Sequence, residues 1–143
     1  MAIVLITGVF DVLHPEHIKF LHKAHQFVQD LNQDKSDYQL WLGLETDQRV
    51  KALKGPSRPL NVVAKRQANL LKLGLIDRVF ILPADFGQAA SRRQLLARLK
   101  PQFLLVSSQT PFLAAKRRLL AEVGGQVKVI YPYNPQISTT KIL

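Results

Sequence analysis

The chain has 143 residues, 47% of them hydrophobic, and its formal net charge is +10. That length suits one hydrophobic core, so we expect a single domain over residues 1–143. Because the chain has no cysteine, disulfides, thiol catalysis and thiolate metal sites are excluded. No basic leader precedes the first apolar run, which is too short for a signal peptide or a membrane span. We therefore expect a soluble, cytoplasmic protein with no membrane partner.

The positive charge is concentrated in two blocks. Residues 49–76 contain seven Lys or Arg and no acid, and residues 86–121 contain seven more, again without an acid. Such an excess favours polyanions, whether nucleoside triphosphates, nucleic acid or acidic membrane surfaces. The second block is typical of solvated helix faces. The first includes the loop 54–59, which is either a phosphate-binding loop or a charged turn between helices.

Strands and helices are predicted to alternate along the chain. Short apolar runs predict strands at residues 3–6, 40–44, 79–82, 103–106 and 127–131. Most of these runs lack period-two alternation, as expected of strands buried on both faces of a parallel sheet. Apolar residues recur at helical spacing over 15–31, 62–73, 88–99 and 113–123, with Gly74 and Gly124 as stop signals. The pattern predicts an α/β fold, a doubly wound five-stranded parallel sheet of the Rossmann-like kind.

The clearest functional signal lies at the first strand-to-helix junction. Gly8 permits a sharp turn, Pro15 suits the first helical position, and His14 and His17 stand three residues apart at the helix start. A helix start presents unpaired N–H groups and the positive end of the helix dipole. The pattern therefore indicates a phosphate-binding site, with a packed polar cap as the alternative.

Other motifs narrow the kind of site. The Gly-x-Gly-x-x-Gly pattern and the Walker A loop are both absent, so a phosphate site must use histidines and lysines. A metal site that adds His22 and His25 is disfavoured, because both lie on the polar helix face and are expected in solvent. Residues 45–47 follow the second strand and so fall on the same sheet edge as the junction. Trp41 is expected in the sheet core rather than as a base-stacking platform.

These motifs resemble a known family. The pattern Gly8-x-Phe10-Asp11-x-x-His14-x-x-His17 resembles the Gly-x-Phe-Asp-x-x-His-x-Gly-His signature of cytidylyltransferase-like nucleotidyltransferases. Residues 137–142 are similar to the second signature of glycerol-3-phosphate cytidylyltransferases. Asp47, Lys51, Arg66 and residues 53–59 resemble the nucleotidyl domain of ADP-heptose synthases, and residues 10–21 resemble archaeal FAD synthetases.

The resemblance implies transfer of a CMP or AMP group from CTP or ATP to a phosphorylated alcohol, sugar or flavin, with release of pyrophosphate. An anionic phosphate oxygen attacks, so catalysis consists of positioning and charge stabilisation. The implied catalytic residues are His14, His17 and Lys54. Nucleotide binding is implied for Gly8, Val9, Phe10, Asp11, Lys51, Arg66, Ser138, Thr139 and Thr140. Substrate or metal orientation is implied for Asp47, Glu16 and Arg58.

The resemblance also implies a Mg²⁺ cofactor, held mostly by triphosphate oxygens, and a homodimer. No certain protein metal ligand is expected. Residues 138–140 would supply hydroxyl and N–H donors to the triphosphate at the start of the last helix, or would act only as its N-cap.

Three departures from the family pattern bear on catalysis. Glu16 replaces the glycine between the two histidines, and a carboxylate 4 Å from a phosphate costs about 1–4 kcal/mol. We expect Glu16→Gly to strengthen triphosphate binding for that reason. Residues 133–136 replace Arg-Thr-x-Gly, and residues 107–110 replace Lys-Gly-Gly-Asp of the heptose-type enzymes. The rival hypothesis is accordingly a catalytically weakened nucleotide- or nucleic-acid-binding module of the same fold.

Overall fold

The structure, a computed structural model, describes residues 1–132. Five strands form one parallel sheet in the order β3-β2-β1-β4-β5, which confirms the predicted α/β, doubly wound fold. The elements in chain order are β1 (Ala2–Gly8), α1 (Pro15–Leu31), η1 (Asn32–Asp34), β2 (Tyr38–Leu44), α2 (Asp47–Lys54), α3 (Val63–Leu71), β3 (Arg78–Ile81), α4 (Ala89–Leu99), β4 (Phe103–Ser107), α5 (Leu113–Glu122) and β5 (Gln126–Tyr131).

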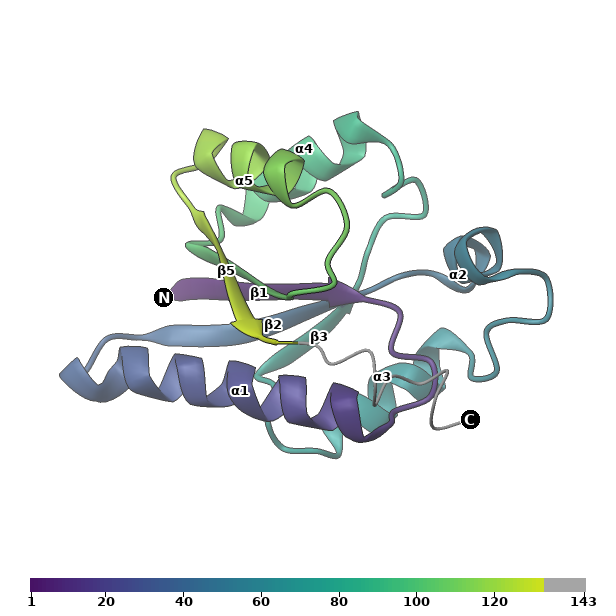
Figure 1. Ribbon diagram of the computed structural model, residues 1–143, viewed down its shortest axis with the longest axis horizontal. Helices are drawn as coiled ribbons and strands as arrows, with labels where there is room; N and C mark the ends of the chain where they lie inside the picture. Colours follow the sequence, from purple (N-terminus) through teal and green to yellow (C-terminus); the bar gives the residue numbers. More distant parts are fainter. Residues whose placement is uncertain (133–143) are drawn as a thin grey trace.

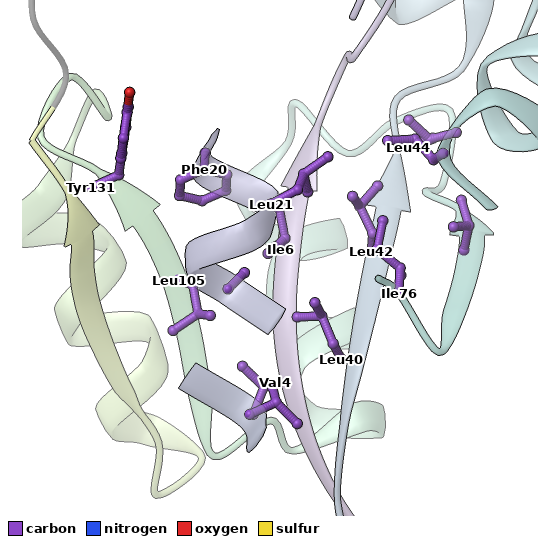
Figure 2. Close-up of a cluster of buried hydrophobic side chains, with 14 residues drawn as sticks. Val4, Ile6, Phe20, Leu21, Leu40, Leu42, Leu44, Ile76, Leu105 and Tyr131 are labelled. Carbon is purple, nitrogen blue, oxygen red and sulfur yellow. The ribbon is translucent and has the colours of Figure 1, made fainter. Parts of the chain in front are cut away.

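Helices cover both faces of the sheet (Figure 1). The α1 face holds the larger core, in which Phe20, Leu21, Ala24 and Val28 of α1 pack against the strands (Figure 2). Helix α3 adds Leu70 to that core. The other face packs against α4 and α5 through the smaller cluster Ile3, Leu5, Leu96, Leu104, Val106, Leu120 and Val127. Burial on both faces explains why the strands read as continuous apolar runs.

Trp41 lies on the α4–α5 face, where it is half-buried against the smaller core. Its ring centroid is 6.3 Å from that of Phe80, and the Arg78 guanidinium lies 4.7 Å above the indole. Trp41 therefore packs in the sheet layer, as expected. No helix within residues 1–132 is long and apolar enough to cross a membrane.

The point where the strand order reverses lies between β1 and β4. From β1 the sheet continues through β2 and β3 on one side, and through β4 and β5 on the other. In open parallel sheets, ligands bind beyond the carboxyl ends of the strands at such a crevice. The fold thus places the β1–α1 junction and the segment after β4 at one ligand-binding edge.

Helix α2 was not predicted. Residues 47–54 form a helix whose N-cap Thr46 accepts a hydrogen bond from the Arg49 N–H at 3.2 Å. Gly55 ends the helix with a φ of 105°, a value that L side chains rarely adopt. Lys54 is consequently the last helical residue rather than the first residue of a loop. Val50 is the one buried side chain of this helix, so it lacks the apolar stripe by which the other helices were found.

Candidate active site

The β1–α1 junction has the geometry that its sequence predicted. His14 is the N-cap of α1, and its Nδ1 accepts a hydrogen bond from the Glu16 N–H at 3.2 Å. Pro15 takes the first helical position. Gly8 is required by a close approach, because a Cβ there would lie 2.7 Å from the ring of Phe10. Phe10 itself has a φ of 46°, which bends the chain back over the end of β1.

His14 and His17 form a stacked pair at the start of α1. Their ring centroids are 3.8 Å apart at an interplanar angle of 32°, and the Phe10 ring lies 5.3 Å from that of His17. Burial, the neighbouring His14 and the Lys54 ammonium together lower the pKa of His17 to about 4, against a weaker opposing effect of the Val12 main chain. Burial also lowers the pKa of His14, although the Glu16 carboxylate partly opposes it. Both rings are therefore neutral near pH 7, and each can offer a ring N–H to a phosphate.

One lysine of α2, Lys54, acts electrostatically on this pair. The Lys54 ammonium contributes to the low pKa of His17, which places its charge in the same electrostatic environment. Lys51 and Lys54 are both exposed on α2. The structure therefore brings Lys54 to the histidine pair from a helix that ends at the glycine turn, and leaves both lysines accessible to a polyphosphate.

Asp11 holds two loops together. It is 3% exposed, and its carboxylate accepts hydrogen bonds from the Arg58 Nε and from the Leu60 and Asn61 N–H groups, each at 2.8 Å. The Asn61 side chain also donates to the Asp11 carbonyl oxygen at 2.7 Å. Burial raises the pKa of Asp11, but these donors outweigh it and hold the pKa below its usual value.

The predicted role of Asp11 in nucleotide binding needs correction as a result. Both oxygens of the Asp11 carboxylate are already engaged by protein donors, so Asp11 positions the loop 58–61 rather than a nucleotide group. Arg58 directs its Nε to that carboxylate, while about a third of its side chain remains exposed. Arg58 therefore remains partly accessible from solvent.

Arg66 is also a positioning residue, because its side chain has no exposed surface. Its guanidinium donates to the Val9 carbonyl at 2.9 Å, to the Asn61 carbonyl at 3.1 Å and to the Asp47 carboxylate at 2.8 Å. The prediction that Arg66 contacts the nucleotide is wrong for this structure, since a phosphate would find no part of it accessible. Arg66 ties the junction, α2 and the loop before α3 into one unit. The Val9 carbonyl is engaged in that network.

A pocket of about 310 Å³ opens in the crevice between β1 and β4. Its walls come from the junction, α1, β4, β5 and the segment leading to α5, and they include Ile6, Phe10, His17, Phe20, Leu105 and Ser107. His17 thus faces both the start of α1 and the pocket. A ligand whose phosphates lie at the helix start has a largely apolar cavity next to it.

Glu16 turns away from the expected phosphate position and into this pocket. It is 3% exposed, and its Oε2 accepts a hydrogen bond from the hydroxyl of Tyr131 at the end of β5. Its Oε1 is buried and has no hydrogen-bond partner within residues 1–132. The prediction that Glu16 stands at the helix start as an open carboxylate is therefore corrected. The charge lies in the cavity wall, where both Glu16 and Tyr131 line the pocket.

The opposite wall of the pocket carries a cation that the sequence did not single out. Lys116 of α5 is half-buried, and its Nζ donates to the Thr110 hydroxyl at 2.6 Å. Burial and the nearby Arg92 lower the pKa of Lys116. The second basic block was interpreted as solvated helix faces, which is wrong for this member of it. The contact of Lys116 with Thr110 could not be predicted, because Thr110 lies in the segment between β4 and α5 and helical periodicity gives no information about that segment.

Acidic groups at this edge are paired with arginines. Glu45 is 7% exposed and lies 3.3 Å from the Arg49 Nε. Burial raises the pKa of Glu45 more than Arg49 and the other neighbouring arginines lower it. Asp47 binds Arg66 and leaves about a third of its side chain exposed.

No group of three or more His, Asp or Glu within residues 1–132 could hold a metal ion. The four-histidine site is not formed: His22 is exposed, and the ring of His25 lies 3.1 Å from the Leu75 carbonyl, where solvent was expected. The predicted triphosphate donors Ser138, Thr139 and Thr140, and the departure at 133–136, lie outside the described residues.

The junction, its neutral histidine pair and the crevice at the strand-order reversal lie together at the edge of a doubly wound α/β domain where such sheets bind ligands. The family model Cytidylyltransferase-like matches residues 5–143, and the chain belongs to that family. The resemblance to cytidylyltransferase-like proteins inferred from the junction motif is thereby confirmed.

Particular relatives are similar over almost the whole chain. The Bifunctional protein HldE of Vibrio cholerae is 32% identical over 142 residues, which are 99% of this chain and 27% of that protein. The protein of the same name from Pelobacter propionicus is 36% identical over 142 residues, 99% of this chain and 26% of its own length. The chain thus spans about a quarter of the length of these curated relatives.

Among solved structures, the lipopolysaccharide core biosynthesis protein from Thermoplasma volcanium has a TM-score of 0.67 at 22% identity. The match covers 94% of this chain and 99% of that one. At this level of identity the likeness concerns the fold, and it supports the Rossmann-like architecture described above.

Proposed function

We propose that the protein transfers a CMP or AMP group from CTP or ATP to a phosphorylated small molecule and releases pyrophosphate. The observation that carries the proposal is the stacked pair of His14 and His17, neutral near pH 7, at the start of α1. Two ring N–H donors at a helix N-terminus suit a polyphosphate, because the helix dipole adds to the donors. Lys54 beside the pair supplies a full positive charge.

In the proposed reaction, a phosphate oxygen of the acceptor forms a bond to the α-phosphorus of the nucleotide. The bond from that phosphorus to the bridging oxygen breaks, and pyrophosphate leaves with the electron pair. The nucleophile is already an anion, so no side chain has to remove a proton. His14 and His17 donate to phosphate oxygens as charge builds on them, and Lys51 and Lys54 attract the leaving pyrophosphate.

A Mg²⁺ ion enters this proposal only as an ion carried by the triphosphate. Carboxylates of residues 1–132 do not form a protein cage for it: the oxygens of Asp11 are engaged, and Asp47 and Glu45 are paired with arginines. Bound in this way, the ion would neutralise charge on the phosphate oxygens. From the same resemblance we propose a cytoplasmic homodimer, and light scattering of the purified protein tests the dimer.

Two features of the acceptor follow from the site. Its attacking phosphate must approach from the side not occupied by the nucleotide, and Arg58 is a partly exposed cation available to it. The loop that bears Arg58 is held against the junction by Asp11 and Asn61. We propose that Arg58 attracts the acceptor phosphate there, since a guanidinium matches phosphate geometry.

The test is pyrophosphate release from each of the four nucleoside triphosphates against phosphorylated alcohols, heptose phosphates and flavin mononucleotide, with and without Mg²⁺. The proposal expects release that depends on one nucleotide and one acceptor together. Saturable nucleotide binding without release under any combination would instead support the non-catalytic module, a reading favoured by the change from glycine to Glu16 between the histidines. Salt-sensitive RNA binding that free nucleotide does not displace would support the same alternative.

A further inference from the structure

The pocket contains a hydrogen-bond acceptor that no group within residues 1–132 satisfies. Glu16 Oε1 is buried and has no partner within residues 1–132, while Oε2 is held by the Tyr131 hydroxyl. A buried carboxylate oxygen left unpaired costs stability, because its lost hydration is not replaced by a hydrogen bond. Unpaired buried polar atoms are rare in folded proteins, and one in a cavity wall points to a ligand that supplies the missing partner.

The surroundings of Glu16 indicate which part of a ligand it meets. The cavity lies next to His17, where the phosphates are expected, and its walls are largely apolar, with Phe10 and Phe20 among them. A flat, weakly polar nucleoside suits such walls better than a phosphorylated alcohol or sugar does. Tyr131 fixes the carboxylate from the far side, so Oε1 is oriented before the ligand arrives.

We propose that Glu16 selects the nucleotide by accepting a hydrogen bond from a donor on the nucleoside. This inference rests on the proposed function, and it assigns a specificity role to the residue that stands where the family has glycine. Two nucleoside groups offer such a donor. One is the amino group at C4 of cytosine or at C6 of adenine, the ring positions at which uracil and guanine carry a carbonyl oxygen; the amino group of guanine is at C2 instead. The other is a ribose hydroxyl.

The energetic effect is discrimination rather than tight binding. A nucleotide that brings a donor removes the cost of the unpaired oxygen. One that brings a carbonyl oxygen leaves the cost in place and sets two acceptors against each other. Sites built to pair with a substrate donor reject analogues lacking it far more strongly than apolar pockets reject a change of size.

The experiment measures dissociation constants by calorimetry for three kinds of nucleotide pair: CTP with UTP, ATP with GTP, and each ribonucleotide with its 2′-deoxy form. For the wild-type protein we expect a preference of about tenfold or more in at least one kind of pair: for CTP over UTP, for ATP over GTP, or for a ribonucleotide over its 2′-deoxy form. Glu16→Met fills similar space without an acceptor and should reduce that preference to within about threefold. Glu16→Gln keeps one oxygen and should retain part of it.

Two further variants make the outcome decisive. Lys54→Ala should weaken all members of a pair to a similar extent, so their ratio stays unchanged. Tyr131→Phe leaves the carboxylate but removes its anchor and should narrow the preference, which provides a second test if Glu16→Met does not fold by circular dichroism. The inference is overturned if the wild type shows no preference in any pair, or if the preference survives Glu16→Met. Binding of no nucleotide at all would overturn the proposed function as well, so the two failures are distinguishable.

Discussion

Replacing Asp11 by Asn tests whether this residue holds the site together. The carboxylate accepts three hydrogen bonds, each of 2.8 Å, and is 3% exposed. An amide of the same shape keeps one acceptor oxygen but places an NH₂ group against a main-chain N–H. One charge-assisted bond is lost and the others weaken, at about 1.5–3 kcal/mol for a bond to a charged group. Because Arg58 is about a third exposed, water replaces part of its loss.

We therefore expect Asp11→Asn to lower the free energy of unfolding by about 2–4 kcal/mol. Urea denaturation followed by far-ultraviolet circular dichroism measures it. Asp37→Asn is the matched control, since that carboxylate is 73% exposed and its one ion pair spans 3.9 Å. The control should change stability by less than about 0.5 kcal/mol. If Asp11→Asn lowered the free energy of unfolding no more than the control does, Asp11 would not hold the two loops together. Its predicted role in nucleotide binding would then stand again.

Three further predictions concern the histidine pair and its lysine. His17→Ala should reduce turnover by more than about tenfold with a smaller effect on nucleotide binding, whereas His22→Ala, exposed on the same helix, should leave turnover unchanged. Lys54→Ala should raise the nucleotide KM and flatten its salt dependence, and Lys35→Ala, which precedes β2 at the opposite sheet edge, should do neither. Since the pKa of His17 is about 4 in the fold against its ordinary value of 6.5, the unfolded chain binds one more proton between these pH values. The contribution of His17 to the free energy of unfolding should thus be fully present above about pH 6.5 and fall by up to about 3 kcal/mol towards pH 4. His17→Gln should reduce this dependence of stability on pH.

Local patterns were sufficient for most of the fold. All five strands lie where continuous apolar runs predicted them, and four of the helices lie where apolar residues recur at helical spacing. Burial of the strands on both faces and of each helix along one stripe produces these two patterns. Helix α2 was not predicted because Val50 is its only buried side chain, so its sequence has no apolar stripe. Its capping residues Thr46 and Gly55 were the available signal.

The site was predictable only where its residues are neighbours in the chain. The pairing of His14 with His17 follows from their spacing at a helix start. In contrast, Asp11 meets its loop across about 50 positions, and Glu16 meets Tyr131 across 115. A single sequence contains nothing that reports such pairings, so the buried roles of Asp11 and Arg66, and the inward turn of Glu16, required the structure.

The positions of Trp41 and Tyr131 give the molecule two separate optical signals. Its indole is the only one in the chain and lies on the α4–α5 face, below the Arg78 guanidinium and beside Phe80. Nucleotide bound in the crevice beside α1 leaves those surroundings intact, whereas unfolding removes the cation and exposes the ring. Indole emission therefore follows denaturation even at saturating nucleotide, while the phenol of Tyr131, in the pocket wall, responds to occupancy. One sample can thus report ligand binding and folding at different wavelengths, without a label.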